Sequence, residues 1–164
     1  PAVAAIYEAI LDHEDATGIH YTGWQRGAYP TADTARSIFD AGTLYVGVDE
    51  TGAVWGSMNL NGQQLPEYQN GAWTIPAEDR QVAVIQTLTI DPARAGQGLA
   101  RQMVAFAEDT ARRQGKTVLR LDTGTENLPA NRMYPALGYK AAGTVDTFFM
   151  GDSQRPLNLY EKKL

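Results

Sequence analysis

The amino-acid sequence predicts an α/β fold of the α+β type, in which helices flank a mixed, mostly antiparallel sheet with a central β–α–β unit. Three observations lead to this prediction. Two helix-like segments come first, a hairpin-like pair of strands follows, and an amphipathic helix then stands between two apolar strands. The chain has 164 residues, of which 43% are hydrophobic, and we expect residues 1–164 to form one domain with a substantial core.

The first elements are expected to be two helices. Residues 2–17 carry apolar side chains at helical spacing, and Gly18 is a suitable stop. Residues 18–30 form an aromatic loop. Thr31 is placed to cap a second helix, which Gly42 ends.

Strands follow these helices. Residues 43–48 and 53–60 are rich in β-formers and are separated by a turn at 49–52, which predicts a hairpin. Residues 61–80 hold many turn formers without a clear period, and such long irregular stretches are often functional. Residues 82–90 form the clearest strand of the chain.

The second half of the chain alternates between helix and strand. A turn at Asp91-Pro92 leads to an amphipathic helix. A short buried strand, a short helix closed by Gly138 and two further strands then follow. The expected bounds of these elements are 99–111, 117–121, 127–137, 139–149 and 157–162.

The composition limits the classes of function. A formal net charge of −5 and a pI of about 5.0 disfavour a nucleic-acid partner. The chain contains no cysteine, which removes disulfides, thiolate metal sites and cysteine nucleophiles. No apolar segment is long enough to span a bilayer, and no secretory leader pattern is visible. We therefore expect a cytoplasmic protein without a metal and without a membrane partner.

A glycine-rich turn joins the clearest strand to the amphipathic helix, with the sequence Gly96-Gln97-Gly98-Leu99-Ala100. A helix N-terminus has unpaired N–H groups and a partial positive charge, and glycines let a ligand approach the backbone. Such a turn can cradle a pyrophosphate. The alternative is that the glycines only shape a tight turn.

A second pattern lies in the short helix that begins near Asn127. Ala130 and Tyr134 are four residues apart and share one helix face, and Leu137-Gly138 closes the element. Taken alone, this pattern also fits ordinary core packing with a glycine cap.

Together, the two patterns resemble the acetyl-CoA-binding half of the GNAT N-acetyltransferase superfamily over residues 82–139. The resemblance implies the GNAT fold, acetyl-CoA as co-substrate and transfer of an acetyl group to a primary amine by direct attack in a ternary complex. It implies that Tyr134 donates a proton to the departing thiolate, which is chemically reasonable for a phenol. The residues implied to bind the cofactor are Leu88, Thr89, Ile90, Gly96, Gln97, Gly98, Leu99, Ala100, Arg101, Asn127, Ala130 and Tyr134.

One position departs from the family pattern. The residue before the first glycine is Ala95, where the family usually has Arg or Gln. Arg94 or Arg101 could supply the missing charge, or backbone N–H groups could suffice. A non-catalytic sensor of acyl-CoA on the same fold is therefore the alternative function.

The general base is left open by the sequence. Asp91 and Asp122 each follow a strand of the β–α–β unit, and an ordered water is an equal candidate. His13 and His20 are isolated from these motifs. The triplet that begins at Asp122 also matches the Asp-Thr-Gly of aspartic proteases, but it stands between a strand and a helix, unlike the site in those largely β enzymes.

The acceptor is expected to bind near the aromatic loop. Trp24 and Tyr29 could line a pocket for an organic amine, or they could only cover the core. A small polyamine, an antibiotic, an amino acid and a protein N-terminus are all open as acceptors. A homodimer is a further expectation from the family.

Overall fold

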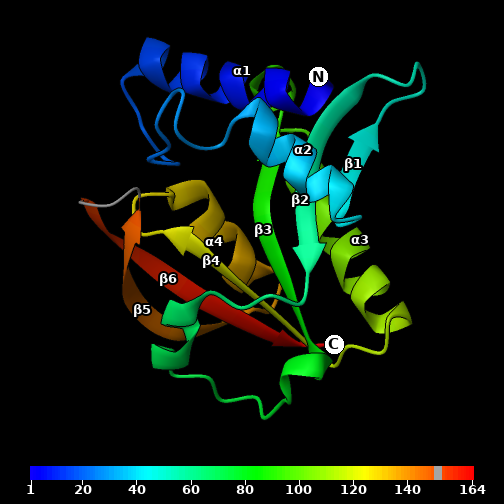
Figure 1. The fold of residues 1–164 in the computed structure, drawn as a ribbon, viewed down its shortest axis with the longest axis vertical. Helices are drawn as coiled ribbons and strands as arrows, with labels where there is room; N and C mark the ends of the chain where they lie inside the picture. Colours follow the sequence, from blue (N-terminus) through cyan, green and yellow to red (C-terminus); the bar gives the residue numbers. More distant parts are fainter. Residues whose placement is uncertain (150–152) are drawn as a thin grey trace.

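The computed structural model describes residues 1–149 and 153–164. Within them the strands form a six-stranded sheet in the order β1-β2-β3-β4-β6-β5, and of these neighbours only β3 and β4 are parallel. The strands are β1 (Leu44–Val48), β2 (Val54–Asn61), β3 (Val82–Ile90), β4 (Val118–Gly124), β5 (Lys140–Phe149) and β6 (Ser153–Lys163). The mixed, mostly antiparallel sheet is thus confirmed (Figure 1).

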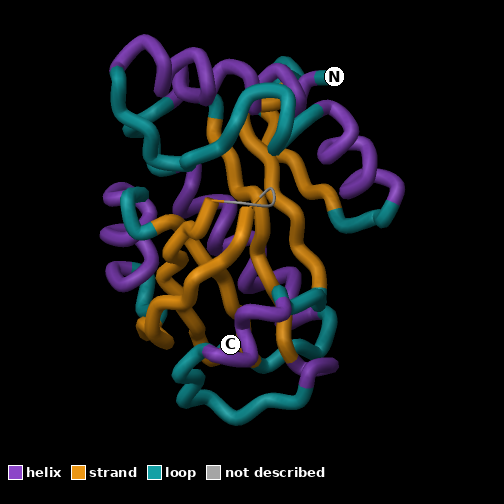
Figure 2. The backbone as a smooth tube through the Cα atoms, turned by 60° about the vertical axis from the view of Figure 1, so that its left-hand side comes forward, coloured by secondary structure: helices purple, strands orange, loops and turns teal. Residues whose placement is uncertain are grey.

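Helices cover both faces of this sheet (Figures 1 and 2). The helix α3 connects β3 to β4 and completes the predicted β–α–β unit. The described helices are α1 (Ala2–Thr17), α2 (Ala32–Asp40), α3 (Leu99–Arg113) and α4 (Leu128–Ala136). Among the residues described, no helix is both long and apolar enough to cross a membrane.

The central strand β3 separates two hydrophobic clusters. Ala83 and Ile85 face the cluster that contains α3 and α4, whereas Val82 and Val84 face the cluster covered by the segment 61–81. All four residues are buried. A strand that is buried on both faces needs an almost continuous apolar run, which explains why this strand is the clearest in the sequence.

Most of the predicted bounds agree with the structure, and the differences have local causes. The bounds of α1 and β3 match the prediction. The second helix ends at Asp40 with Ala41 as its cap, and Gly42 follows with a φ of 70°. The strand β4 continues to Gly124 and β6 begins earlier than expected, because hydrogen bonding between neighbouring strands extends both beyond their apolar runs.

The irregular segment 61–81 is held against the sheet by a buried ion pair. Glu161 on β6 is fully buried and accepts hydrogen bonds from the backbone N–H groups of Thr74 and Ile75 at 2.6 and 3.0 Å. Its other carboxylate oxygen faces Nε of Arg120 at 3.7 Å. The guanidinium of Arg120 also lies 4.2 Å from the ring centroid of Trp73. This pair therefore fixes a segment whose own sequence has no regular period.

We predict that Glu161→Gln lowers the free energy of unfolding by about 3 kcal/mol, because the buried guanidinium of Arg120 loses its counter-charge. Urea denaturation followed by circular dichroism would measure this loss. Arg80→Ala is the matched control, since it removes the exposed ion pair with Glu78 and should cost at most about 1 kcal/mol. Equal effects of the two variants would contradict the stabilising role of the buried pair.

Candidate functional site

The site begins where the two parallel strands separate. β3 and β4 pair from Val82 with Val118 to Ile85 with Leu121, and no further pair is formed between them in the described chain. Both strands nevertheless continue, to Ile90 and to Gly124. The backbone of β3 after Ile85 therefore has no neighbouring strand on this side, and a slot opens between the strands.

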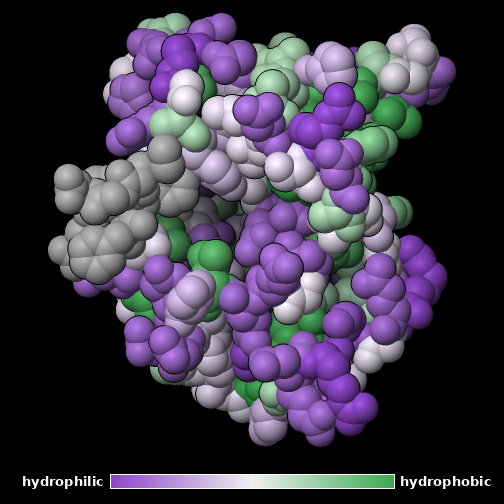
Figure 3. Space-filling view, viewed as in Figure 1, coloured by the Kyte–Doolittle hydropathy of each residue, from purple (hydrophilic) through white to green (hydrophobic). Residues whose placement is uncertain are grey.

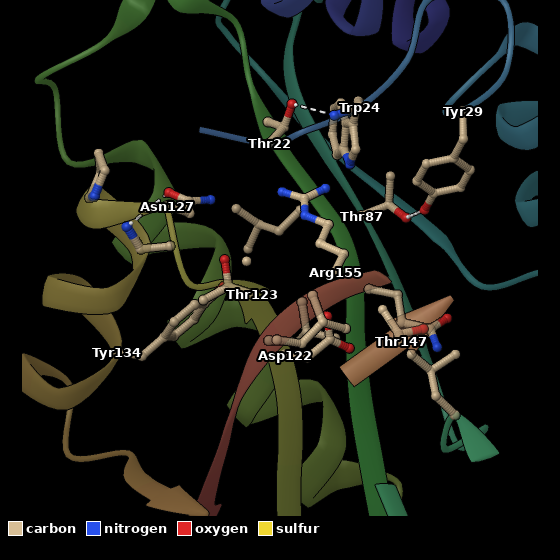
Figure 4. A pocket seen from close by; sticks show the side chains of 18 of the residues that line it. Thr22, Trp24, Tyr29, Thr87, Asp122, Thr123, Asn127, Tyr134, Thr147 and Arg155 are labelled. Atoms are coloured by element: carbon tan, nitrogen blue, oxygen red, sulfur yellow. Dashed lines mark hydrogen bonds between the residues drawn. The ribbon is translucent and has the colours of Figure 1, made fainter. Parts of the chain in front are cut away.

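A bulge in β3 lies at the start of this slot. The pairing register with β2 shifts between Ser57 and Asn59, and Thr87 has a φ of 49°, which is unusual for a residue other than glycine. The hydroxyl groups of Thr87 and Tyr29 are 2.5 Å apart and hydrogen-bonded. The aromatic loop therefore holds the bulge in place and lies beside the slot (Figure 4).

A cavity of about 650 Å³ occupies the slot and extends toward the aromatic loop. In the space-filling view the surface is hollowed below the part formed by α1, within a mostly hydrophilic face (Figure 3). The polar lining of this first cavity comes from segments that are far apart in the sequence. These polar residues include Thr22, Glu67, Gln86, Thr87, Asp122, Thr123, Asn127, Tyr134, Thr147 and Arg155.

A second cavity of about 450 Å³ adjoins the first, because Ile90, Ala100 and Met133 line both. It lies at the N-terminus of α3, where Gly98 is the N-cap with a φ of 73° and no side chain caps the helix. The backbone N–H groups that begin this helix therefore lack an intrahelical partner, and they can hold an anion. The sequence-predicted residues that line this cavity are Ile90, Gly96, Gly98, Leu99, Ala100 and Arg101.

Three arginines line the second cavity together with Ala95. Arg94 lines the second cavity but forms an ion pair with Asp49, so its charge is already partnered. Hydrogen bonds from Thr51 and Arg94 hold the pKa of Asp49 well below its usual range. Arg101 and Arg132 also line this cavity, and neither forms an ion pair with a described residue. Arg132 is a candidate anion ligand that the sequence reasoning missed, because only the fold brings this residue of α4 to the N-terminus of α3.

Tyr134 lies on α4 and faces the first cavity across from β3 (Figure 4). Its ring packs against those of Tyr139 and Tyr160, at centroid distances of 5.6 and 5.7 Å. Its hydroxyl makes no hydrogen bond with any residue that the structure describes. Burial, followed by the charge of Asp122, raises the pKa of Tyr134 well above its usual value. The phenol of Tyr134 is therefore protonated at neutral pH.

The orientation of α4 depends on Asn131, which the sequence analysis did not single out. Its side-chain amide donates to the carbonyl oxygens of Gly124 and Asn127 at 2.9 Å, and to that of Thr125 at 3.2 Å. Its amide oxygen accepts a hydrogen bond from the Tyr160 hydroxyl at 2.8 Å, and a second at 2.9 Å from an amide on β6. One side chain thus ties α4 to the end of β4 and to β6.

Asn127 also has a structural role at the start of α4. It is the N-cap, and its side-chain oxygen accepts a hydrogen bond from the Ala130 N–H at 3.2 Å. Asn127 and Ala130 both line the first cavity, as does Leu88. The predicted residues Thr89 and Gln97 line neither cavity, and the Thr89 hydroxyl is hydrogen-bonded to that of Ser57 at 2.8 Å.

Asp122 is the carboxylate of β4 at the end of the β3–β4 pairing, and it lines the first cavity. The Tyr68 hydroxyl donates a hydrogen bond to its Oδ2 at 2.7 Å, while Oδ1 has no hydrogen bond with a described residue. Burial raises the pKa of Asp122, although the hydrogen bond from Tyr68 and the charge of Arg155 oppose this effect. Asp91 instead accepts a hydrogen bond from the Ala93 N–H and lines neither cavity.

The aromatic loop combines packing with access to the cavity. The rings of Trp24 and Tyr29 make an edge contact at 6.0 Å, and Trp24 makes a second edge contact with the buried ring of Tyr7. Both Trp24 and Tyr29 also line the first cavity. His13 and His20 lie outside the lining of the two cavities. Across the described ranges, no group of His, Asp and Glu side chains is arranged to hold a metal ion.

We predict that Asn131→Ala lowers the free energy of unfolding by about 2 kcal/mol, because partly buried carbonyl and hydroxyl groups lose their hydrogen-bond partner. Thermal and urea unfolding would measure this loss. Asn70→Ala provides the control at an exposed position without a side-chain hydrogen bond among the residues described. A loss no larger than that of the control would rule out Asn131 as the link between α4, β4 and β6.

Comparisons with known proteins agree with this geometry. A family model described as the acetyltransferase (GNAT) family matches residues 7–139. An uncharacterized N-acetyltransferase of Methanocaldococcus jannaschii is 31% identical over 68 residues, which cover 42% of this chain and 30% of that relative. The chain thus spans less than a third of the length of this curated relative.

Solved structures are similar over nearly the whole chain. A GCN5-related N-acetyltransferase from Kribbella flavida has a TM-score of 0.71 at 22% identity, covering 100% of this chain and 91% of its own. A Salmonella typhimurium structure with its cofactor acetyl-CoA has a TM-score of 0.66 at 20% identity, covering 98% of this chain and 88% of its own. At these identities the likeness shows the fold.

Proposed function

The chain belongs to the acetyltransferase (GNAT) family, and from this premise we propose that it transfers an acetyl group from acetyl-CoA to a primary amine. The observation that carries the proposal is the pair of adjoining cavities. One lies between the separated strands beside Tyr134, and the other lies at the uncapped N-terminus of α3. We further propose that residues 1–164 act as one domain in this reaction.

The shape and chemistry of the two cavities fit acetyl-CoA. The open edge of β3 offers the backbone of Leu88 and Ile90 to an extended amide-containing arm, in the manner of an added strand. The N-terminus of α3 with Arg101 and Arg132 offers N–H groups and positive charge to a pyrophosphate. The acetyl-CoA in the Salmonella typhimurium structure of the same fold supports this assignment.

Acetyl-CoA supplies the acetyl group as a thioester. The amine nitrogen forms a bond to the acetyl carbon in a ternary complex, and the carbon–sulfur bond breaks. The acceptor loses two protons when its ammonium form becomes an amide. Tyr134 donates a proton to the departing thiolate and regains one from the nitrogen, so that one proton in total is released. The chain has no cysteine that could carry the acetyl group in between.

Asp122 is the carboxylate best placed to receive the first proton of the ammonium group. Its Oδ1 has no other hydrogen bond among the described residues, and burial brings its pKa closer to neutrality. Tyr68 holds the other oxygen and thereby orients the carboxylate. Asp91, the other carboxylate that the sequence left open, is engaged at the turn outside the cavities.

The proposal is tested first by calorimetry with acetyl-CoA, with NAD and ATP as controls, and then by thiol release in the presence of amines. Selective binding of acetyl-CoA with amine-dependent thiol release is the expected result. Binding without thiol release from any amine would instead support the alternative of an acyl-CoA sensor. Failure of the folded protein to bind acetyl-CoA would overturn both.

We predict that Tyr134→Phe lowers kcat about 100-fold, because the departing thiolate loses its proton donor. Calorimetry should show that the Kd for acetyl-CoA changes little, since the ring and its packing are kept. Tyr45→Phe is the control, because Tyr45 lines neither cavity. A parallel loss of binding and turnover would contradict the proton-donor role.

We predict that Asp122→Asn lowers kcat/KM at neutral pH about 100-fold and changes its pH profile. A general base works only when deprotonated, so wild-type kcat/KM should fall as the pH drops through the pKa of Asp122. Burial raises this pKa, which places the fall above the usual range of a carboxyl group. Steady-state rates across pH would measure the profile. The control variant Asp91→Asn should still show the decrease of kcat/KM at low pH. If Asp122→Asn also showed this decrease, Asp122 would be excluded as the base.

A further inference from the structure

The first cavity is lined by Arg155, which has no role in the proton transfers proposed above. Arg155 lies on β6 opposite Thr147 of β5, and both line the cavity. Its side chain extends from β6 into the space between the slot and the aromatic loop, toward Thr22 (Figure 4). The sequence analysis missed this residue, because it lies outside the family motifs and close to the C-terminus.

Two glycines leave the space that the guanidinium of Arg155 occupies. A Cβ atom on Gly23 would lie 2.4 Å from its Cζ, and a Cβ atom on Gly124 would lie 2.6 Å from one of its terminal nitrogens. Gly23 belongs to the aromatic loop and Gly124 ends β4. The guanidinium is thus enclosed between two backbone segments, and a side chain at either position would displace it.

Among the residues that the structure describes, the charge of Arg155 has no direct counter-ion. Within the described part of the chain it forms no ion pair, and its one hydrogen bond goes to the carbonyl oxygen of Tyr21 at 3.5 Å. Burial lowers the pKa of Arg155, while the charges of Glu14 and Asp122 oppose this effect without contacting it. Most of the guanidinium donors are therefore available to a ligand in the cavity.

Glu14 is not available as a partner for Arg155. It is buried, and its two carboxylate oxygens accept hydrogen bonds from the backbone N–H and the hydroxyl of Thr22, at 2.7 and 2.9 Å. These bonds shape the loop against which the guanidinium lies. Glu14 therefore does not complete the site, and the described residues leave room for an anionic ligand beside Arg155.

We propose that Arg155 binds the carboxylate of the acceptor, so that the acceptor is an amine that also carries a carboxylate, such as an amino acid. A guanidinium recognises a carboxylate through parallel hydrogen bonds. The same cavity presents Asp122 and Glu67 to the ammonium group. Arg155 therefore matches the carboxylate of a zwitterion, and the two carboxylates match its ammonium group. Asp122 faces the ammonium group, which is the end that reacts. This inference rests on the proposed function for the identity of the reaction.

The test compares amino acids with their amides, for example leucine with leucinamide and phenylalanine with phenylalaninamide. Each amide keeps the amine and the side chain but removes the negative charge. It is also the less basic amine, so nucleophile availability alone would favour it. We expect kcat/KM from thiol release to favour the acid about 10- to 100-fold, the range for a charge-assisted hydrogen bond. A β-amino acid and a γ-amino acid in the same panel would distinguish the spacing of the two charges.

Two variants address Arg155 itself. Arg155→Met removes the charge, and Gly124→Ala keeps the charge but displaces the guanidinium. Both should abolish the preference for the acid over the amide. Arg36→Met is the matched control, because it removes the same charge from an exposed position on α2 and should retain the preference.

Calorimetry with CoA-saturated protein separates the failure of this inference from the failure of the proposed function. Tighter binding of the acid than of the amide, with this difference lost in Arg155→Met, would support the carboxylate site. If no thiol were released in the same protein, the proposed transfer would be overturned and the carboxylate site would stand. Equal binding and equal kcat/KM for acid and amide, or an unchanged preference in Arg155→Met, would overturn the carboxylate site. Binding of neither ligand would overturn it as well.

Discussion

The early end of hydrogen bonding between the parallel strands β3 and β4 is the constraint on which the site depends. Pairing stops at Ile85 and Leu121, although both strands continue. The open backbone edge, the bulge at Thr87 and the first cavity all follow from this separation. Because a short turn leads from the end of β3 to α3, the uncapped N-terminus of α3 lies at the same end of the sheet, and the second cavity joins the first.

Polar links between distant segments complete the walls of the first cavity. Asn131 binds α4 to β4 and β6, which places Tyr134 opposite the open edge of β3. Glu161 and Arg120 hold the segment 61–81 against the sheet. That segment brings Tyr68 to Asp122 and Glu67 to the hydroxyl of Thr147. These links thus decide where the side chains that line the first cavity lie.

Charge is distributed along the cavities in an order that suits the proposed reaction. The chain as a whole is acidic, with a net charge of −5, yet Arg101 and Arg132 line the end at α3 and Arg155 lines the end at the aromatic loop. The neutral phenol of Tyr134 and the carboxylate of Asp122 lie between these cationic ends. Burial raises the pKa of both groups, so the phenol of Tyr134 stays protonated at neutral pH and the carboxylate of Asp122 is a stronger base than an exposed one.

The sequence by itself determined the order and type of the elements and the fold class, because side-chain periods, glycine stops and helix caps act over a few residues. It also predicted the turn at Gly98 and the helix of Tyr134, which line the two cavities, although their roles in binding and catalysis stay predictions. The tertiary structure alone decided which carboxylate faces the cavity and brought in Arg132 and Arg155. These residues meet through strand pairing and helix packing between distant segments, and no local pattern in the chain records such contacts.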